Sequence, residues 1–184
     1  MRYSLDQFSE ECRASLQADA GERGQEQVRR HLEKLLAEPE ALGAALRRQP
    51  EAGRHLLYRD AETRMHVFAH VYAKAGASSA HDHGPCWIIY GNATGYTDIT
   101  DWKRLDNGER DGHAELEKLR QYRVHAGEAV LFRKGAIHST FHPEGDSMLV
   151  RVISDDMDAM WRMSFDPEKK TVTARPPRQR SSSP

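Results

Sequence analysis

Two histidines, His81 and His83, lie one residue apart in the segment HDHGPC, residues 81–86. If this segment is a β-strand, the alternation of side chains places both imidazoles on one face, a few ångströms apart. Imidazole is a common metal ligand, but two imidazoles alone bind an ion weakly, so a third ligand is needed. The best candidate is His138, in the glycine-punctuated segment GEAVLFRKGAIHSTFH. These three residues predict a histidine metal site.

The N-terminal part of the chain, residues 1–55, has the periodicity of helices. Ser4 and Gln7 form a capping-box pattern, and apolar residues follow at helical spacing. Val28 and Leu32 mark a second amphipathic helix, and a third is expected over residues 39–49, before Pro50. We expect these helices to form an extension that packs on the following domain.

From about residue 57 the pattern changes to short strands separated by Gly, Asn and Asp turns. In RMHVFAHVYA, one face carries His66, Phe68, His70 and Tyr72, and the other carries smaller or apolar residues. Several such strands predict an antiparallel sandwich or barrel. The expected organisation is therefore an all-β barrel over residues 56–175, preceded by the α-helical extension and followed by a disordered tail, residues 176–184.

Composition narrows the possible partners. The chain has 184 residues, 38% of them hydrophobic, and a net charge of −1, which argues against nucleic acid as a main partner. Basic clusters such as residues 175–180 are expected to be solvated surface. No apolar run has the length of a membrane span or the character of a signal peptide. The two cysteines, Cys12 and Cys86, suggest a reducing compartment, so we expect a cytoplasmic protein.

The segments around the histidines resemble the two sequence motifs of the cupin superfamily. In the first motif, glycines flank a His-x-His pair, as Gly76 and Gly95 do here. In the second, Gly127, Gly135 and His138 keep the family spacing, with Arg133 at a position that is usually proline. The resemblance covers residues 57–165. It implies a double-stranded β-helix, or jelly-roll barrel, that holds a metal between its two sheets.

The ligand set narrows the resemblance further. Most metal cupins carry a glutamate shortly after the second histidine, at the positions that Trp87 and Ile88 occupy here. Three neutral histidines without a carboxylate are similar to the site of the cysteine dioxygenases and other thiol dioxygenases. This resemblance implies iron(II), although three imidazoles also accept nickel, copper or zinc.

The thiol dioxygenases also suggest where a substrate carboxylate is held. In that family an arginine beside a tyrosine ahead of the barrel binds it, and here the segment LLYRD places Arg59 after Tyr58. A guanidinium suits this role because it donates two parallel hydrogen bonds. His70 and Tyr72 are expected to line the substrate pocket.

The late strand SMLVRVIS departs from the family. In cysteine dioxygenases a Ser-x-His-x-Tyr run on this strand orients substrate and oxygen. Here the corresponding positions hold Leu149, Arg151 and Ile153, so the run is not present. An inward-facing Arg151 beside a metal requires an anion, so Arg151 is a second candidate for the carboxylate clamp. His142 shares the parity of His138 and is a candidate for acid–base catalysis. Cys86 is expected to be a packed scaffold residue without a crosslink.

The leading expectation is an iron(II) dioxygenase that converts a small thiol carboxylate and O₂ into a sulfinate, as a monomer or homodimer. Two alternatives remain. One is a three-histidine dioxygenase that cleaves a carbon–carbon bond of a diketone or enol. The other is a non-enzymatic sensor of a metal or small ligand, in which the helices mediate dimerisation.

Overall fold

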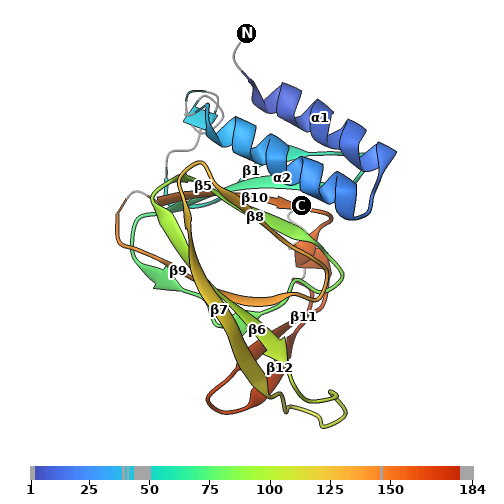
Figure 1. The fold of residues 1–184 in the computed structure, drawn as a ribbon, viewed down its shortest axis with the longest axis vertical. Coiled ribbons are helices and arrows are strands. Elements are labelled where there is room, and N and C mark those ends of the chain that lie inside the picture. Colours follow the sequence, from blue (N-terminus) through green and yellow to red (C-terminus); the bar gives the residue numbers. More distant parts are fainter. Residues whose placement is uncertain (1–2, 39, 41, 44–50, 146, 179–184) are drawn as a thin grey trace, which may run out of the picture.

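The computed structural model describes residues 3–38, 40, 42–43, 51–145 and 147–178. Two helices, α1 (Leu5–Ala18) and α2 (Glu22–Leu36), precede a β-barrel (Figure 1). The strands are β1 (Gly53–Arg59), β2 (His66–Tyr72), β3 (Gly76–Ala77), β4 (Ala80–His81), β5 (Ile88–Thr94), β6 (Tyr96–Arg104), β7 (Leu116–His125), β8 (Ala129–Phe132), β9 (Ile137–His142), β10 (Ser147–Ile153), β11 (Arg162–Asp166) and β12 (Thr171–Arg175), with a short 3-10 helix, η1 (Met157–Ala159), after β10.

The strands form two sheets whose order identifies the architecture. One sheet has the order β1-β2-β10-β5-β8, and the other has the order β12-β11-β4-β9-β6-β7, with β3 paired to β9. Except at the β6–β7 hairpin, the chain changes sheets at each step from β4 to β10, and all the sheet pairings are antiparallel. This is the double-stranded β-helix, and it confirms the predicted all-β fold with an N-terminal helical extension.

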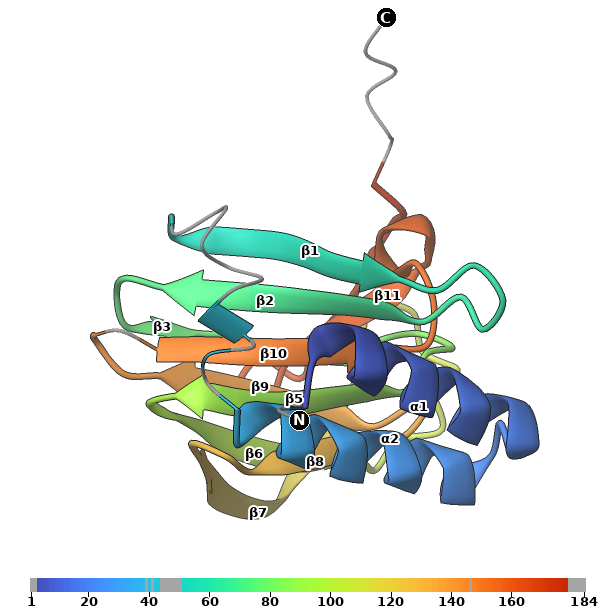
Figure 2. The same cartoon turned by 90° about the horizontal axis from the view of Figure 1, so that it is seen from above.

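The two helices lie over the outer face of the first sheet (Figure 2). Ser4 caps α1, and its hydroxyl accepts a hydrogen bond from the Gln7 amide at 3.1 Å, as the capping pattern predicted. The helices bury an apolar face that includes Phe8 and Leu32 against outward side chains such as Val67. A Cβ on Gly91 of β5 would lie 2.6 Å from a Leu36 methyl carbon, so glycine at this position allows α2 to approach the sheet closely.

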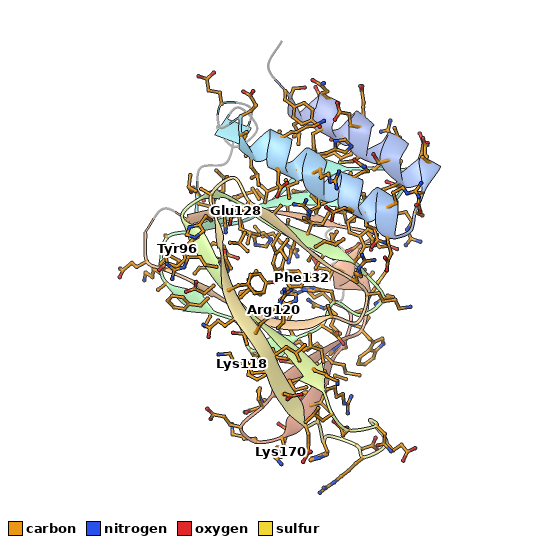
Figure 3. All side chains as sticks on the ribbon, in the orientation of Figure 1. Tyr96, Lys118, Arg120, Glu128, Phe132 and Lys170 are labelled. Atoms are coloured by element: carbon orange, nitrogen blue, oxygen red, sulfur yellow. The ribbon has the colours of Figure 1, made fainter. Side chains whose placement is uncertain are left out.

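The inner faces of the sheets enclose a second apolar cluster. As predicted, β2 alternates, because Val67 packs with the helices while Phe68 and Tyr72 pack between the sheets. The labelled ring of Phe132 lies over the barrel interior in Figure 3. This inner space contains the histidines.

Some boundaries differ from those expected. The first strand begins at Gly53 rather than after residue 55. Of the third helix expected over residues 39–49, only Glu40, Leu42 and Gly43 are described, and these are helical. Most of the tail expected at residues 176–184 lies outside the described residues. No described helix combines the length and apolar character required to cross a bilayer.

Candidate metal centre

The structure brings His81, His83 and His138 together between the two sheets. His81 on β4 is the direct register partner of His138 on β9, and His83 follows just after β4 ends. One ring nitrogen from each of the three lies within 4.8 Å of the others. His83 and His138 are 4% and 0% exposed, whereas His81 is half-buried. The predicted trio therefore converges from two strands and a turn.

The turn after His83 depends on Gly84. Its φ is +59°, and a Cβ at this position would lie 2.4 Å from the carbonyl oxygen of Trp161. Only glycine accommodates both that conformation and that close approach without strain. On the other side of this turn, Asp82 accepts hydrogen bonds from the Gly84 and Met163 amides at 3.0 and 2.8 Å. Asp82 thus fixes the backbone beside the histidines and faces away from their rings.

Contacts of the Nδ1 atoms orient two of the imidazoles. His81 Nδ1 lies 2.8 Å from the Ser79 carbonyl oxygen, and His83 Nδ1 lies 3.1 Å from the Met157 sulfur. Since both partners are acceptors, each Nδ1 carries the proton and the Nε2 lone pair is free to bind a metal. The third ring, His138, stacks on Phe132 with centroids 3.9 Å apart.

The electrostatics keep these imidazoles neutral. Burial lowers the pKa of His83 and His138 well below the ordinary histidine value, and the repulsion that would follow if a second histidine of the trio were protonated lowers both further. Burial also lowers the pKa of His81. Neutral imidazoles bind metals and protonated ones do not, so the site favours the ligand form at neutral pH.

The geometry fits a single divalent ion. Nε2 of His83 lies 3.3 Å from Nε2 of His138, and two nitrogens bound at about 2.1 Å to one tetrahedral or octahedral ion are about 3.0–3.4 Å apart. No carboxylate joins the group among the described residues. Trp87 and Ile88, at the expected glutamate positions, are buried in the two apolar clusters. Three neutral ligands leave the charge of a divalent ion uncompensated and leave coordination positions open.

A cavity of about 420 Å³ reaches the histidines. Its lining includes His81, His83, Arg151 and Arg162, together with Met157. Arg151 is 7% exposed and faces inward, as the strand parity suggested. No sequence pattern pointed to Met157 or Arg162, which reach the site from η1 and from the start of β11.

The structure places two further residues at this site. Tyr90 on β5 directs its hydroxyl to within 3.1 Å of His83 Nε2. The register pairs Tyr90 with Arg151, so both side chains enter the barrel side by side. Arg175, expected as solvated surface, is exposed but also lines the cavity. The alternation of side chains along β5 could have predicted that Tyr90 points inward. It could not have predicted that Tyr90 lies next to His83 and Arg151.

Arg59 does not join the histidines. It lies exposed at the end of β1 and lines a separate cavity of about 670 Å³, together with Arg54 and Phe68. Its neighbour Tyr58 is engaged elsewhere, because its hydroxyl donates to Asp60 at 2.7 Å. The strand β1 lies at the edge of its sheet, which explains why Arg59 and the histidines do not share a cavity.

His70, Tyr72 and His142 form their own cluster. The Tyr72 ring stacks on His142 at 4.0 Å, and the His70 ring lies 6.1 Å from Tyr72. His142 follows His138 by four residues on β9, which corresponds to about 13 Å along a strand. His142 therefore lies away from the trio, and the pocket-lining roles expected for His70 and Tyr72 and the acid–base role expected for His142 stay predictions.

Cys86 packs in the inner apolar cluster, and its sulfur lies 3.4 Å from the Met160 sulfur. Burial raises the pKa of its thiol. This environment is that of a packed, unreactive thiol.

No known family model matches the chain. No curated protein matches it either. Among solved structures, a Bacillus halodurans protein has 15% identity over 59% of this chain and 74% of its own, with a TM-score of 0.45. The DMSP lyase DddQ from Ruegeria pomeroyi has 14% identity over 63% and 52%, with a TM-score of 0.44. A recombinant oxalate oxidase in complex with glycolate has 19% identity over 50% of this chain and a TM-score of 0.39, and the match spans only 42% of its length. The strand order, rather than these similarities, identifies the fold.

Proposed function

We propose that this protein is a mononuclear non-haem iron(II) dioxygenase that adds both atoms of O₂ to the sulfur of a small thiol carboxylate. The observation that carries the proposal is a cavity shared by a buried arginine and two members of the three-histidine group. Three neutral ligands suit a divalent ion that also binds an anion, and Arg151 lines the same cavity as His81 and His83. The overall change is thiol plus O₂ to sulfinate plus one proton, so atoms and electrons balance.

The ion would be held by Nε2 of His81, His83 and His138. When bound, it supplies a Lewis acid that lowers the pKa of the substrate thiol and a centre that activates O₂. Nickel, copper and zinc fit the same ligands, so metal analysis is part of the test.

The side chains around this group bind and orient the substrate. Arg151 can donate two hydrogen bonds to the substrate carboxylate, which fixes the distance between that carboxylate and the sulfur. Burial raises the pKa of Tyr90, although the nearby charge of Arg151 opposes this effect. The phenol therefore stays protonated and can donate a hydrogen bond to the reacting sulfur or oxygen atoms beside His83.

The test combines metal analysis with O₂ consumption in the presence of cysteine, 3-mercaptopropionate or a β-diketone. We expect bound iron, uptake that depends on a thiol, and a product that is heavier by two oxygen atoms. Uptake with the diketone alone would replace the proposal by carbon–carbon bond cleavage. Zinc or no metal, with no uptake for any compound, would replace it by a sensor function.

A further inference from the structure

The cavity above the histidines carries more positive charge than a substrate with one carboxylate can offset. Three arginines line it, Arg151, Arg162 and Arg175, and none of the described lining residues is acidic. Its volume of about 420 Å³ is that of a site for a small organic molecule. The positions of the arginines decide how many anionic groups it can take.

Arg151 is the cation on the first sheet. It is 7% exposed, its Nε has no hydrogen-bond partner, and its guanidinium lies 5.3 Å from the centroid of the Phe68 ring. No ion pair of Arg151 exists with any described residue of the chain. A buried guanidinium without a carboxylate is costly unless a ligand supplies the anion.

Arg162 and Arg175 form a second cationic group, on the other sheet. They are direct register partners on the antiparallel strands β11 and β12. Like charges directly opposite one another destabilise a strand pair. Arg175 donates to the Ser164 hydroxyl at 2.8 Å, whereas the buried Nε of Arg162 has no partner.

The negative charge of Asp158 acts on Arg162, but the Asp158 carboxylate already interacts with two other arginines. Its carboxylate lies 2.5 Å from an Arg54 nitrogen and 3.8 Å from Arg178. Within the described chain, Arg162 and Arg175 therefore share no carboxylate of their own. An anionic ligand group would relieve their repulsion.

We propose that the cavity binds a small substrate with two acidic groups, one held by Arg151 and the other by Arg162 and Arg175. With a divalent ion, the site carries five positive charges, of which a thiolate and one carboxylate offset two. A second carboxylate, sulfonate or phosphonate offsets at least one more. The inference builds on the proposed function for the thiol, but the two anion contacts require only the arginines.

Binding tests the anion contacts without chemistry. Calorimetric titration of the purified protein with succinate, 3-sulfopropionate and 3-phosphonopropionate is compared with butyrate, which has a similar length and one acid group. We expect at least one diacid to bind roughly tenfold or more tightly than butyrate, because its second acid group accepts charged hydrogen bonds from Arg162 and Arg175. The three diacids distinguish the kinds of second group.

Matched variants locate the second group. In Arg162→Gln and Arg175→Gln, the ratio of the diacid affinity to the butyrate affinity should fall towards one. Arg110→Gln removes the same charge from an exposed loop and should keep the native ratio. Removing Arg162 should not unfold the protein, since it relieves repulsion, and the melting temperature checks this. Equal binding of diacids and butyrate by the native protein overturns the inference, as does an unchanged preference in both cavity variants.

Turnover separates this inference from the proposed function. We expect kcat/KM for mercaptosuccinate to exceed that for 3-mercaptopropionate by roughly tenfold. If no thiol is oxidised but the diacid preference depends on Arg162, the inference stands and the dioxygenase proposal fails. If kcat/KM is the same for 3-mercaptopropionate and mercaptosuccinate, and diacids bind no more tightly than butyrate, the dioxygenase proposal stands and the inference fails.

Discussion

The hydroxyl of Tyr90 lies 3.1 Å from Nε2 of His83. Tyr90 is on β5, and His83 is in the turn that precedes this strand. The alternation of β5 directs Tyr90 inward, next to its register partner Arg151. A hydroxyl that can donate a hydrogen bond therefore lies beside Nε2 of His83, the nitrogen assigned to the metal.

Replacing Tyr90 by phenylalanine should reduce kcat more than it changes KM. Loss of one donor at the reacting atoms is expected to lower kcat about tenfold to hundredfold, while the metal content stays the same. Steady-state O₂ consumption and metal analysis measure both effects. Tyr96→Phe, at the start of β6, is the matched control and should behave as the native protein. An unchanged kcat in Tyr90→Phe would show that this hydroxyl takes no part.

Substitution of His138 by glutamine should remove the metal. His138 is fully buried and contributes one of the three nitrogens, and two remaining imidazoles bind an ion weakly. Metal analysis after dialysis should show loss of most of the bound ion, with circular dichroism reporting the fold. His142→Gln, on the same strand but far from the trio, should retain it. Full metal content in His138→Gln contradicts the ligand assignment.

The two candidate arginines should differ in their effect on substrate binding. Arg151 lines the cavity at the histidines, whereas Arg59 is exposed and lines another cavity. We expect Arg151→Gln to raise KM for a thiol carboxylate by about tenfold to a hundredfold, because the substrate loses one charged hydrogen-bonding partner. Arg59→Gln should leave KM unchanged. The reverse result would restore Arg59 as the clamp, and no change in either variant would exclude both.

Acid should destabilise the fold partly through His142. Burial lowers the pKa of His142 from about 6.5 to about 4. The unfolded chain therefore binds a proton at a higher pH than the folded chain. The resulting stabilisation is fully present above about pH 6.5 and is lost as the pH falls towards 4.

Urea denaturation between these pH values measures this effect. In His142→Gln, the free energy of unfolding should vary less with pH than in the native protein. His125→Gln, at an exposed position on β7, should keep the native dependence of the free energy of unfolding on pH. A native slope in His142→Gln would show that this histidine does not contribute.

Asp60 should anchor α1 to the start of the barrel. It is 1% exposed and pairs with Arg13 at 2.7 Å. Burial opposes its ionisation, but hydrogen bonds from Thr63, Tyr58 and Arg13 hold the pKa of this carboxyl below its usual range. Removing the carboxylate leaves the Tyr58 hydroxyl and the Thr63 amide without their acceptor, and loss of hydrogen bonds to a charged group costs about 1.5–3 kcal/mol.

Urea denaturation of Asp60→Ala should show that loss, with turnover per folded molecule unchanged because Asp60 is remote from the cavity. The control is Asp98→Ala, which breaks the more exposed pair with Arg123 on the β6–β7 hairpin. Its cost should be below about 1 kcal/mol. Equal losses in the two variants would contradict a special role for the buried carboxylate of Asp60.

The sequence by itself determined the parts of this protein that depend on local spacing. Helical periodicity placed α1 and α2, and alternation assigned the two faces of β2. The spacing of His81 and His83 and the motif around His138 identified the three residues that meet. The absence of a glutamate after His83 was visible directly, because Trp87 and Ile88 occupy those positions.

Only the tertiary structure decided which other side chains meet the histidines. Spacing fixes the face of a strand on which a residue lies, but strand order and register fix its neighbours across the sheets. Arg59 was expected at the site and lies on an edge strand, whereas Tyr90 enters beside Arg151 through the pairing of β5 with β10. Arg162 reaches the cavity because β11 pairs with β4, a contact between segments about 80 residues apart that no local pattern encodes.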